Sequence, residues 1–286
     1  MRRQLGVFIV AGVLVSAGAD AGWSFMQKAR STGGRETHAG DIDSRVQIEG
    51  ADARIEFLNA AANPMLGAGA YMLMRGAPLK GLFIVNPEKR TYTKFDPEGL
   101  AQAVAPGAAA NEGAGMQMKV ADVKSEKLLE EPGGEMQGLA TMHYRYRKSY
   151  TMTMEMASMK VVTAHEIVED VWQTTEIDLG GGFGKAMRKM SGAGVFAEIE
   201  KLSDADRERT AGFALKRITV DHSIPQGKGM MARMMGGKEE TITTTTEVLE
   251  LTRASIPAST FAIPAGFTET QLMQPGAQAP DLEDKH

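Results

Sequence analysis

The feature of this sequence that most constrains its fold is the alternating stretch from Met142 to Met156. Tyrosine and methionine side chains occupy every second position of the stretch, with Lys148 as the single exception, and the positions between them are polar. Successive side chains of a β-strand point to opposite faces of its sheet, whereas a helix would scatter these residues around its circumference. The stretch therefore predicts a strand about 50 Å long with one aromatic and thioether face.

The same alternation recurs in shorter segments along the rest of the chain. The clearest is a hairpin over residues 81–95, in which Asn86 and Pro87 match the first two positions of a type I turn. A second turn is predicted at Pro132-Gly133-Gly134, before the long strand begins. Further strands are predicted at residues 23–30, 42–48, 53–57, 71–75, 116–129, 161–177, 213–224 and 240–252.

Two segments have helical character instead. Asp96 is a suitable N-cap and Pro97 follows it, which favours a short helix to about residue 104. Residues 183–202 favour one or two longer helices. Strands joined mostly by short turns, with helices inserted between them, indicate a mainly β fold. We predict a curved antiparallel sheet, a half-barrel that is partly wrapped around one or two helices.

The beginning of the chain has the pattern of an export signal. Arg2 and Arg3 precede an apolar segment, and Ala19-Asp20-Ala21 forms a small-x-small cleavage site. The apolar segment is shorter than the about 20 residues of a membrane-spanning helix, and an uncleaved anchor is the competing interpretation. We predict a signal peptide at 1–21, a single domain at 22–268 and a disordered tail at 269–286. The mature product is expected to be soluble, periplasmic or extracellular, and without a transmembrane span.

The composition argues against several classes of function. The chain contains no cysteine, so a thiol nucleophile and a disulfide are both impossible. Its net charge of −4 does not suit a nucleic-acid partner, because such proteins present clustered Lys and Arg. His165-Glu166 lacks the second histidine of a zinc-protease helix, and Gly180 to Lys185 departs from a phosphate-binding loop. We therefore predict no catalytic residues, no metal site and no cofactor.

Three segments carry a resemblance to a known family. They are Asp52 to Phe57, the hairpin from Leu82 to Tyr92, and the closing segment Ile256 to Phe267. In this order they resemble a family of exported bacterial proteins of unknown function, with the half-barrel architecture of the lipoprotein carrier LolA. The resemblance covers residues 40–267 and implies a curved sheet around helices with a hydrophobic cavity between them. It implies no reaction.

The aromatic and thioether face of residues 142–156 is the main candidate site, together with one tryptophan on the returning strand. Its residues are Tyr144, Tyr146, Tyr150, Met152, Met154, Met156 and Trp172. They could form the packed core of the sheet, because methionine readily fills irregular gaps. They could instead line a cavity for a lipid or another apolar ligand. A third interpretation is a copper(I) site with thioether ligands.

The methionine- and glycine-rich segment 227–237 is a second candidate. Met230, Met231, Met234 and Met235 could form a lid that docks on an apolar ligand, or could lie in a disordered surface loop. The leading hypothesis is an exported, non-enzymatic protein that binds a lipid or other apolar molecule in the concave face of the half-barrel. The alternatives are a structural or protein-interaction module of the cell envelope without a ligand, and methionine-based copper(I) binding.

Overall fold

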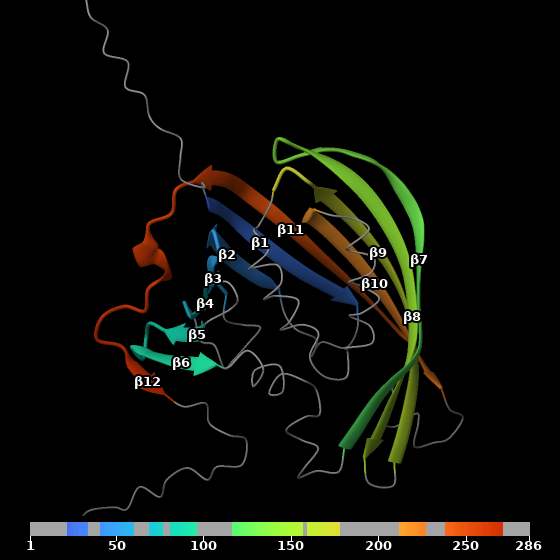
Figure 1. The fold of residues 1–286 in the computed structure, drawn as a ribbon. Helices are drawn as coiled ribbons and strands as arrows, with labels where there is room; N and C mark the ends of the chain where they lie inside the picture. Colours follow the sequence, from blue (N-terminus) through green and yellow to red (C-terminus); the bar gives the residue numbers. More distant parts are fainter. Residues whose placement is uncertain are drawn as a thin grey trace, which may run out of the picture.

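The computed structural model describes residues 22–33, 41–59, 69–76, 81–95, 116–156, 159–177, 212–226 and 238–270. These residues form one sheet of twelve strands in the order β12-β6-β5-β4-β3-β2-β1-β11-β10-β9-β8-β7 (Figure 1). All neighbouring strands are antiparallel except β12 and β6, which are parallel. The sheet is curved, and its end strands β7 and β12 do not pair with one another, so it is not a closed barrel. The prediction of a mainly β, curved antiparallel sheet is confirmed.

The sheet has two limbs that differ in strand length and meet at β1 (Gly22–Gly33). The short-strand limb comprises β2 (Ile42–Glu49), β3 (Asp52–Phe57), β4 (Tyr71–Arg75), β5 (Gly81–Asn86), β6 (Thr91–Phe95) and β12 (Thr268–Thr270). The long-strand limb comprises β7 (Met116–Met136), β8 (Leu139–Met156), β9 (Met159–Thr174), β10 (Phe213–Gln226) and β11 (Glu240–Ala254).

Most of the predicted strands form, and the long strand at residues 142–156 is part of β8. The predicted helices at 97–104 and 183–202, the signal peptide at 1–21 and the segment 227–237 lie outside the described residues. The helical element that the described residues do contain is a single 3-10 turn, η2 (Ala258–Phe261). The predicted tail begins inside β12, and residues 271–286 lie outside the description.

The predicted turn at Pro132-Gly133-Gly134 is wrong. Strand β7 continues through it to Met136, and the chain reverses at Gln137 and Gly138 instead. Both residues have positive φ, 53° and 77°, which fits a two-residue hairpin whose twist matches that of the strands. The register between β7 and β8 shifts between Pro132 and Gly134, so these residues form a β-bulge that bends the strand.

The main apolar core lies on one face of the sheet and joins both limbs. Its buried residues are Phe25, Val46, Ile48, Ala53, Met74, Leu82, Ile177, Leu215 and Val248. The rings of Phe25 on β1 and Phe213 on β10 have centroids 5.4 Å apart, although β11 lies between the two strands. Two strand spacings measure about 9.6 Å, so side chains converge on this face, as they do inside a bend. We call it the inner face.

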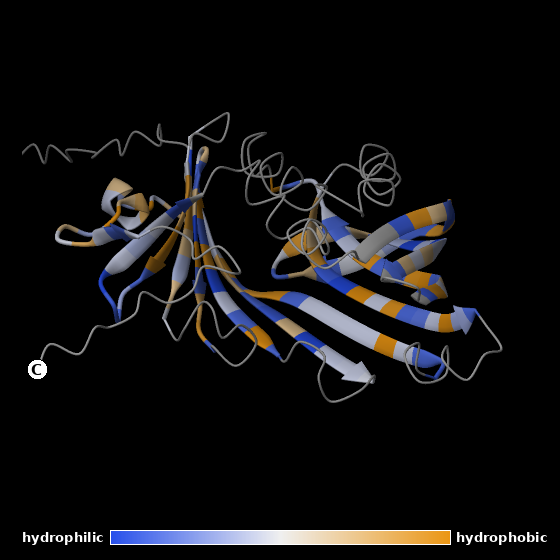
Figure 2. Cartoon of the chain, turned by 90° about the horizontal axis from the view of Figure 1, so that it is seen from below, coloured by the Kyte–Doolittle hydropathy of each residue, from blue (hydrophilic) through white to orange (hydrophobic). Residues whose placement is uncertain are grey.

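A second, smaller core covers the outer face of the short-strand limb. Tyr71, Leu73 and Val85 are buried there beneath Ile263 and Phe267, which belong to the closing segment 256–267. The chain then continues into β12, which pairs with β6 at the edge of the sheet. The closing segment therefore packs against the side opposite the inner face. Figure 2 shows how hydrophobic residues are distributed over the two limbs.

Candidate functional site

The register of the long-strand limb shows which side chains share the inner face with the tyrosines. Strand β8 pairs with β9 without a shift, and Tyr144 lies opposite Val171. Val171 in turn lies opposite Arg217 of β10, and Arg217 lies opposite Thr246 of β11. Continuing through β1 and β2, the same face carries the main apolar core. The tyrosine face of β8 and the core of the short-strand limb are therefore parts of one surface.

The three predicted tyrosines are brought together and buried. Tyr144, Tyr146 and Tyr150 are 8, 4 and 9% exposed. The rings of Tyr144 and Tyr146 lie 6.4 Å apart between centroids and are tilted by 24°. Burial is also the main cause that raises the pKa of Tyr144 above its usual value. The aromatic part of the predicted face is thus enclosed rather than open to water.

The methionines continue this face toward the end of β8. Met152 and Met154 are half-buried and lie opposite Thr163 and Val161 of β9. Met156 lies in the last pair of the ladder, but its side chain is outside the description, as are Met230, Met231, Met234 and Met235. The lid and the copper(I) site therefore stay predictions.

The grouping of Trp172 with the tyrosines is wrong. Trp172 lies opposite His143 in the β8–β9 ladder, and directly opposed residues share a face, so it lies on the outer side of the sheet. Its ring stacks on that of His143 with centroids 4.3 Å apart and a tilt of 4°. Counting pairs outward from Met156 and Met159, the last pair of the ladder, places Trp172 correctly, because the ladder contains no shift.

His143 itself lies on the polar side of β8 and is nevertheless buried. Its Nε2 lies 2.7 Å from Oδ1 of Asp170, and its Nδ1 lies 3.2 Å from Oε1 of Glu131. Arg145 donates from Nε to the same Asp170 oxygen at 2.8 Å, and this hydrogen bond raises the pKa of Arg145. These polar groups satisfy one another, so we assign them a structural role on the outer face.

The inner face also carries charged side chains that the sequence pattern did not group together. Lys148 on β8, Glu169 and His165 on β9, and Arg217 and Asp221 on β10 form what we call the charged belt. Lys148 Nζ lies 2.6 Å from Oε2 of Glu169, and Arg217 Nε lies 3.0 Å from Oε1. Lys148 interrupts the tyrosine face, and the other residues of the belt lie on the two strands between β8 and β11.

The second part of the belt is centred on His165. Its Nδ1 lies 3.1 Å from Oδ1 of Asp221, and its ring stacks on that of Tyr150 with centroids 4.6 Å apart. Burial, together with the negative charge of Asp221, raises the pKa of Tyr150 to about 12. The phenol therefore stays neutral at physiological pH and can offer a hydrogen-bond donor, whereas it cannot serve as a base.

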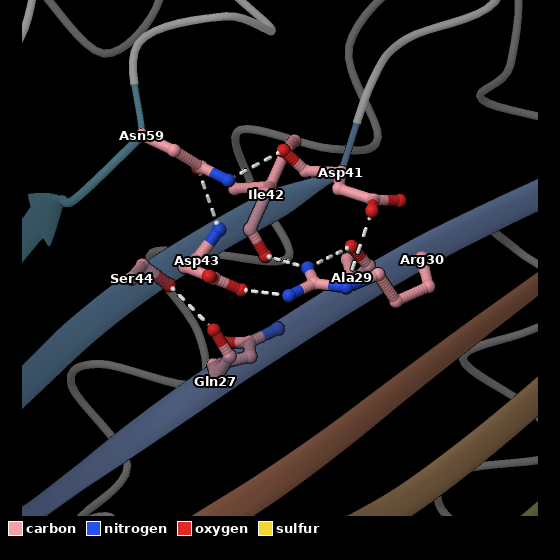
Figure 3. Close-up of polar contacts among 8 residues, drawn as sticks. All are labelled: Gln27, Ala29, Arg30, Asp41, Ile42, Asp43, Ser44 and Asn59. Carbon is pink, nitrogen blue, oxygen red and sulfur yellow. Dashed lines mark hydrogen bonds and ion pairs between the residues drawn. The ribbon is translucent and has the colours of Figure 1, made fainter.

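A different polar cluster lies where β1 ends and β2 begins, near the middle of the strand order (Figure 3). Arg30 forms ion pairs with Asp41 and Asp43, at 3.3 and 2.6 Å, and donates to the carbonyl oxygens of Ala29 and Ile42. The amide of Asn59, beyond β3, donates to the carbonyl of Asp41 and accepts from the backbone N–H of Asp43. These contacts link the end of β1, the start of β2 and the segment after β3, so the cluster fastens the strand ends together.

The rest of the described structure offers no obvious catalytic or metal centre. Across those residues, no group of three or more histidine, aspartate or glutamate side chains is arranged to hold a metal ion. An open pocket lies far from the tyrosine face, lined by Asp52, Arg75, Gly76, Gly81 and Phe83. Among the same residues, no helix has the length and apolar character needed to cross a membrane.

Comparison with known proteins leaves the family open. No protein-family model matches the sequence. No curated protein matches it significantly. Among solved structures, the lipoprotein LppX of Mycobacterium tuberculosis shows a likeness at 9% sequence identity, covering 80% of this chain and 86% of LppX. The TM-score is 0.25, so this likeness carries no argument about fold or function. The fold assignment rests on the sheet itself.

Proposed function

We propose that this protein is an exported, non-enzymatic binder of a lipid or similarly apolar molecule, which lies against the inner face of the curved sheet. One observation carries the proposal. The tyrosine and methionine side chains of β8 and the main apolar core are parts of a single face, which is the side toward which the open sheet curves. A long apolar ligand on this face could contact both limbs.

The side chains on β8 suit such a ligand. Methionine is flexible and polarisable, so Met152 and Met154 can adapt to an irregular apolar chain. Tyrosine rings present an apolar body with a polar tip, as expected for contact with an amphipathic molecule. Binding would come mostly from burial of apolar surface, at about 25 cal/mol per Å².

The predicted export signal and lid belong to the same proposal. Cleavage after residue 21 would release the domain at 22–268 into the periplasm or the medium, where a carrier meets envelope lipids. The methionines of segment 227–237 would then cover the ligand. The domain organisation, the compartment and the family resemblance to LolA-like proteins support this view as predictions from the sequence.

Native mass spectrometry tests the proposal. The mature protein, purified without detergent from an exporting host and incubated with extracted envelope lipids, should carry an adduct of lipid mass. Replacing Met152 and Met154 by Gln should weaken the adduct, because Gln has a similar length but a polar amide. The matched control replaces Thr151 and Thr153 by Gln, since these neighbours point to the outer face.

A specific observation supports a second candidate. The tyrosines are already buried, which is also what a structural or protein-interaction module with a filled core would show. The same experiment separates the two functions. A bare polypeptide mass after incubation with lipids, in a protein that is folded, would favour the structural module over the lipid binder.

A further inference from the structure

We propose that the ligand of the inner face is an anionic amphiphile, and that Arg217 binds its carboxylate or phosphate headgroup. This inference rests on the proposed function and adds the chemical class of the ligand. Arg217 lies on β10, in the part of the charged belt where one carboxylate faces two cations.

The first argument is the exposure of Arg217 beside the buried pair of Lys148 and Glu169. Lys148 and Glu169 form a close and buried pair, because their side chains are only 13 and 11% exposed. Arg217 approaches the other oxygen of the same carboxylate, and its side chain is 36% exposed. Arg217 is therefore the more accessible of the two cations that approach Glu169.

The second argument is the free hydrogen-bonding capacity of Arg217. A guanidinium group has five N–H donors in a planar fork that matches carboxylate and phosphate geometry. Among the described residues, Arg217 forms an ion pair with Glu169 through its Nε atom. The geometry of this contact is not that of a hydrogen bond, so the buried Nε has no hydrogen-bond partner among these residues. The outer nitrogens of the fork have no hydrogen bond to the described residues. An anionic headgroup would satisfy them with a bidentate pair.

The third argument is the position of Arg217 between apolar surfaces. Leu215, two residues earlier on β10, belongs to the main apolar core, and Val171 lies directly opposite on β9, followed by Tyr144 on β8. On the other side lies Thr246 of β11, and a threonine hydroxyl can donate a hydrogen bond to a headgroup oxygen. A ligand held at Arg217 could therefore lay its apolar chain along either limb.

The remaining charges of the belt do not oppose an anion at this point. Asp221 lies four residues further along β10, about 13 Å away in an extended strand. Its carboxylate already interacts with Nδ1 of His165. The headgroup position at Arg217 is thus separated from the second acidic group of the belt.

The test compares three probes with the same sixteen-carbon chain, hexadecanoic acid, hexadecan-1-ol and hexadecyl phosphate, measured by displacement of a fluorescent apolar dye at mildly alkaline pH. Wild-type protein should bind the acid, the phosphate or both about tenfold more tightly than the alcohol, because charge-assisted hydrogen bonds are the stronger ones. Arg217→Met should abolish this preference while retaining affinity for the alcohol. Arg217→Lys should keep part of it. Arg147→Met is the matched control, because Arg147 lies on the outer face of β8 and pairs with Glu126.

Each result has a defined meaning. Preference for the acid or the phosphate that is lost in Arg217→Met and kept in Arg147→Met supports the inference, and the stronger of the two identifies the headgroup. Equal binding of all three probes by the wild type overturns the inference and leaves the proposed function intact. Failure to bind any probe overturns the proposed function as well. If Arg217→Met does not fold, the affinities of the wild type are measured at increasing salt concentration instead. Added salt should weaken binding of the two anionic probes and leave binding of the alcohol unchanged.

Discussion

The two limbs of the sheet bury their side chains in different ways. In the short-strand limb both faces are apolar, since the inner face contains Val46, Met74 and Leu82 and the outer face lies beneath the closing segment. In the long-strand limb the inner face mixes tyrosines with buried ions such as Lys148 and Glu169. Burying ions adds little stability compared with apolar packing. We infer that the short-strand limb stabilises the fold and the long-strand limb carries the function.

The edges of the two limbs also differ. The short-strand limb ends in β12, a strand of three residues, whereas the long-strand limb ends in β7, which has 21 residues. A long free edge favours pairing with other chains, and charged side chains and bulges oppose such pairing. Strand β7 has both, because its ladder with β8 shifts at three places and Lys124, Glu126 and Glu131 are exposed.

The largest effect is expected from apolar truncation in the short-strand limb. Leu82→Ala should lower the free energy of unfolding by about 3 kcal/mol, because Leu82 is fully buried and its removal leaves a cavity. Met152→Ala in the long-strand limb should cost about 1 kcal/mol, since Met152 is only half-buried. Denaturant unfolding measures both. Equal losses of unfolding free energy would mean that Met152 is packed as tightly as Leu82, and that the methionine face is part of the core.

A second prediction compares ion pairs on the two faces of the long-strand limb. Glu169→Gln should lower the free energy of unfolding by about 3 kcal/mol, because it removes a buried negative charge that lies 2.6 Å from the buried ammonium of Lys148. Glu247→Gln breaks the pair with Lys216 on the outer face, where both side chains are partly exposed, and should cost less than about 1 kcal/mol. Similar losses from the two changes would contradict the distinction between the buried and the exposed pair.

Some features of the two limbs are predictable from the sequence, and others are not. The long strand and the 81–95 hairpin were predictable because period-two alternation and turn chemistry are local properties. The charged belt was not, because Lys148, Glu169 and Arg217 come from three strands and meet only through their register. Lys148 was visible only as an interruption of the apolar pattern. A charged residue in an otherwise apolar strand face is the signal that could have indicated a buried partner.

Two predictions from the sequence, the face of Trp172 and the turn at residues 132–134, are wrong because both depend on how neighbouring strands pair. The sequence pattern groups Trp172 with the tyrosines, because its face depends on a register that a single strand does not define. The sequence Pro132-Gly133-Gly134 has the composition of a turn, but glycine with positive φ also fits a bulge, and Gly134 has a φ of 80°. The turn forms at Gln137-Gly138, where the hairpin register allows the two strands to pair along their length.

A third prediction concerns alkaline pH. The pKa of Tyr150 is raised to about 12, whereas an unfolded tyrosine ionises near pH 10. Between these values the unfolded chain loses the proton first, so stability that is present below pH 10 falls by about 2 kcal/mol as the pH rises to 12. Unfolding curves at several pH values should show this fall in the wild type, and Tyr150→Phe should reduce it by about 2 kcal/mol.

Tyr71 provides the matched comparison in the short-strand limb. Burial raises its pKa as well, but the guanidinium of Arg54, 3.8 Å from the ring centroid, acts in the opposite direction. Tyr71→Phe should therefore change the alkaline dependence with the same sign and a smaller amplitude. If Tyr71→Phe had the larger effect, burial on the inner face of β8 would not be the stronger perturbation.

The smallest expected effects lie in the turns of the two limbs. Gln137 follows β7 with a φ of 53° and Arg90 precedes β6 with a φ of 52°, and both conformations are unfavourable for residues other than glycine and asparagine. Gln137→Asn should raise the free energy of unfolding by about 0.5 kcal/mol, because the Gln137 side chain is exposed and little contact is lost. Arg90→Asn relieves the same strain but removes a side chain that packs at Gly266 of the closing segment, so it should gain less. Denaturant midpoints of the two variants measure the difference. An equal gain at both turns would mean that the Arg90 side chain does not help to hold the closing segment on the short-strand limb.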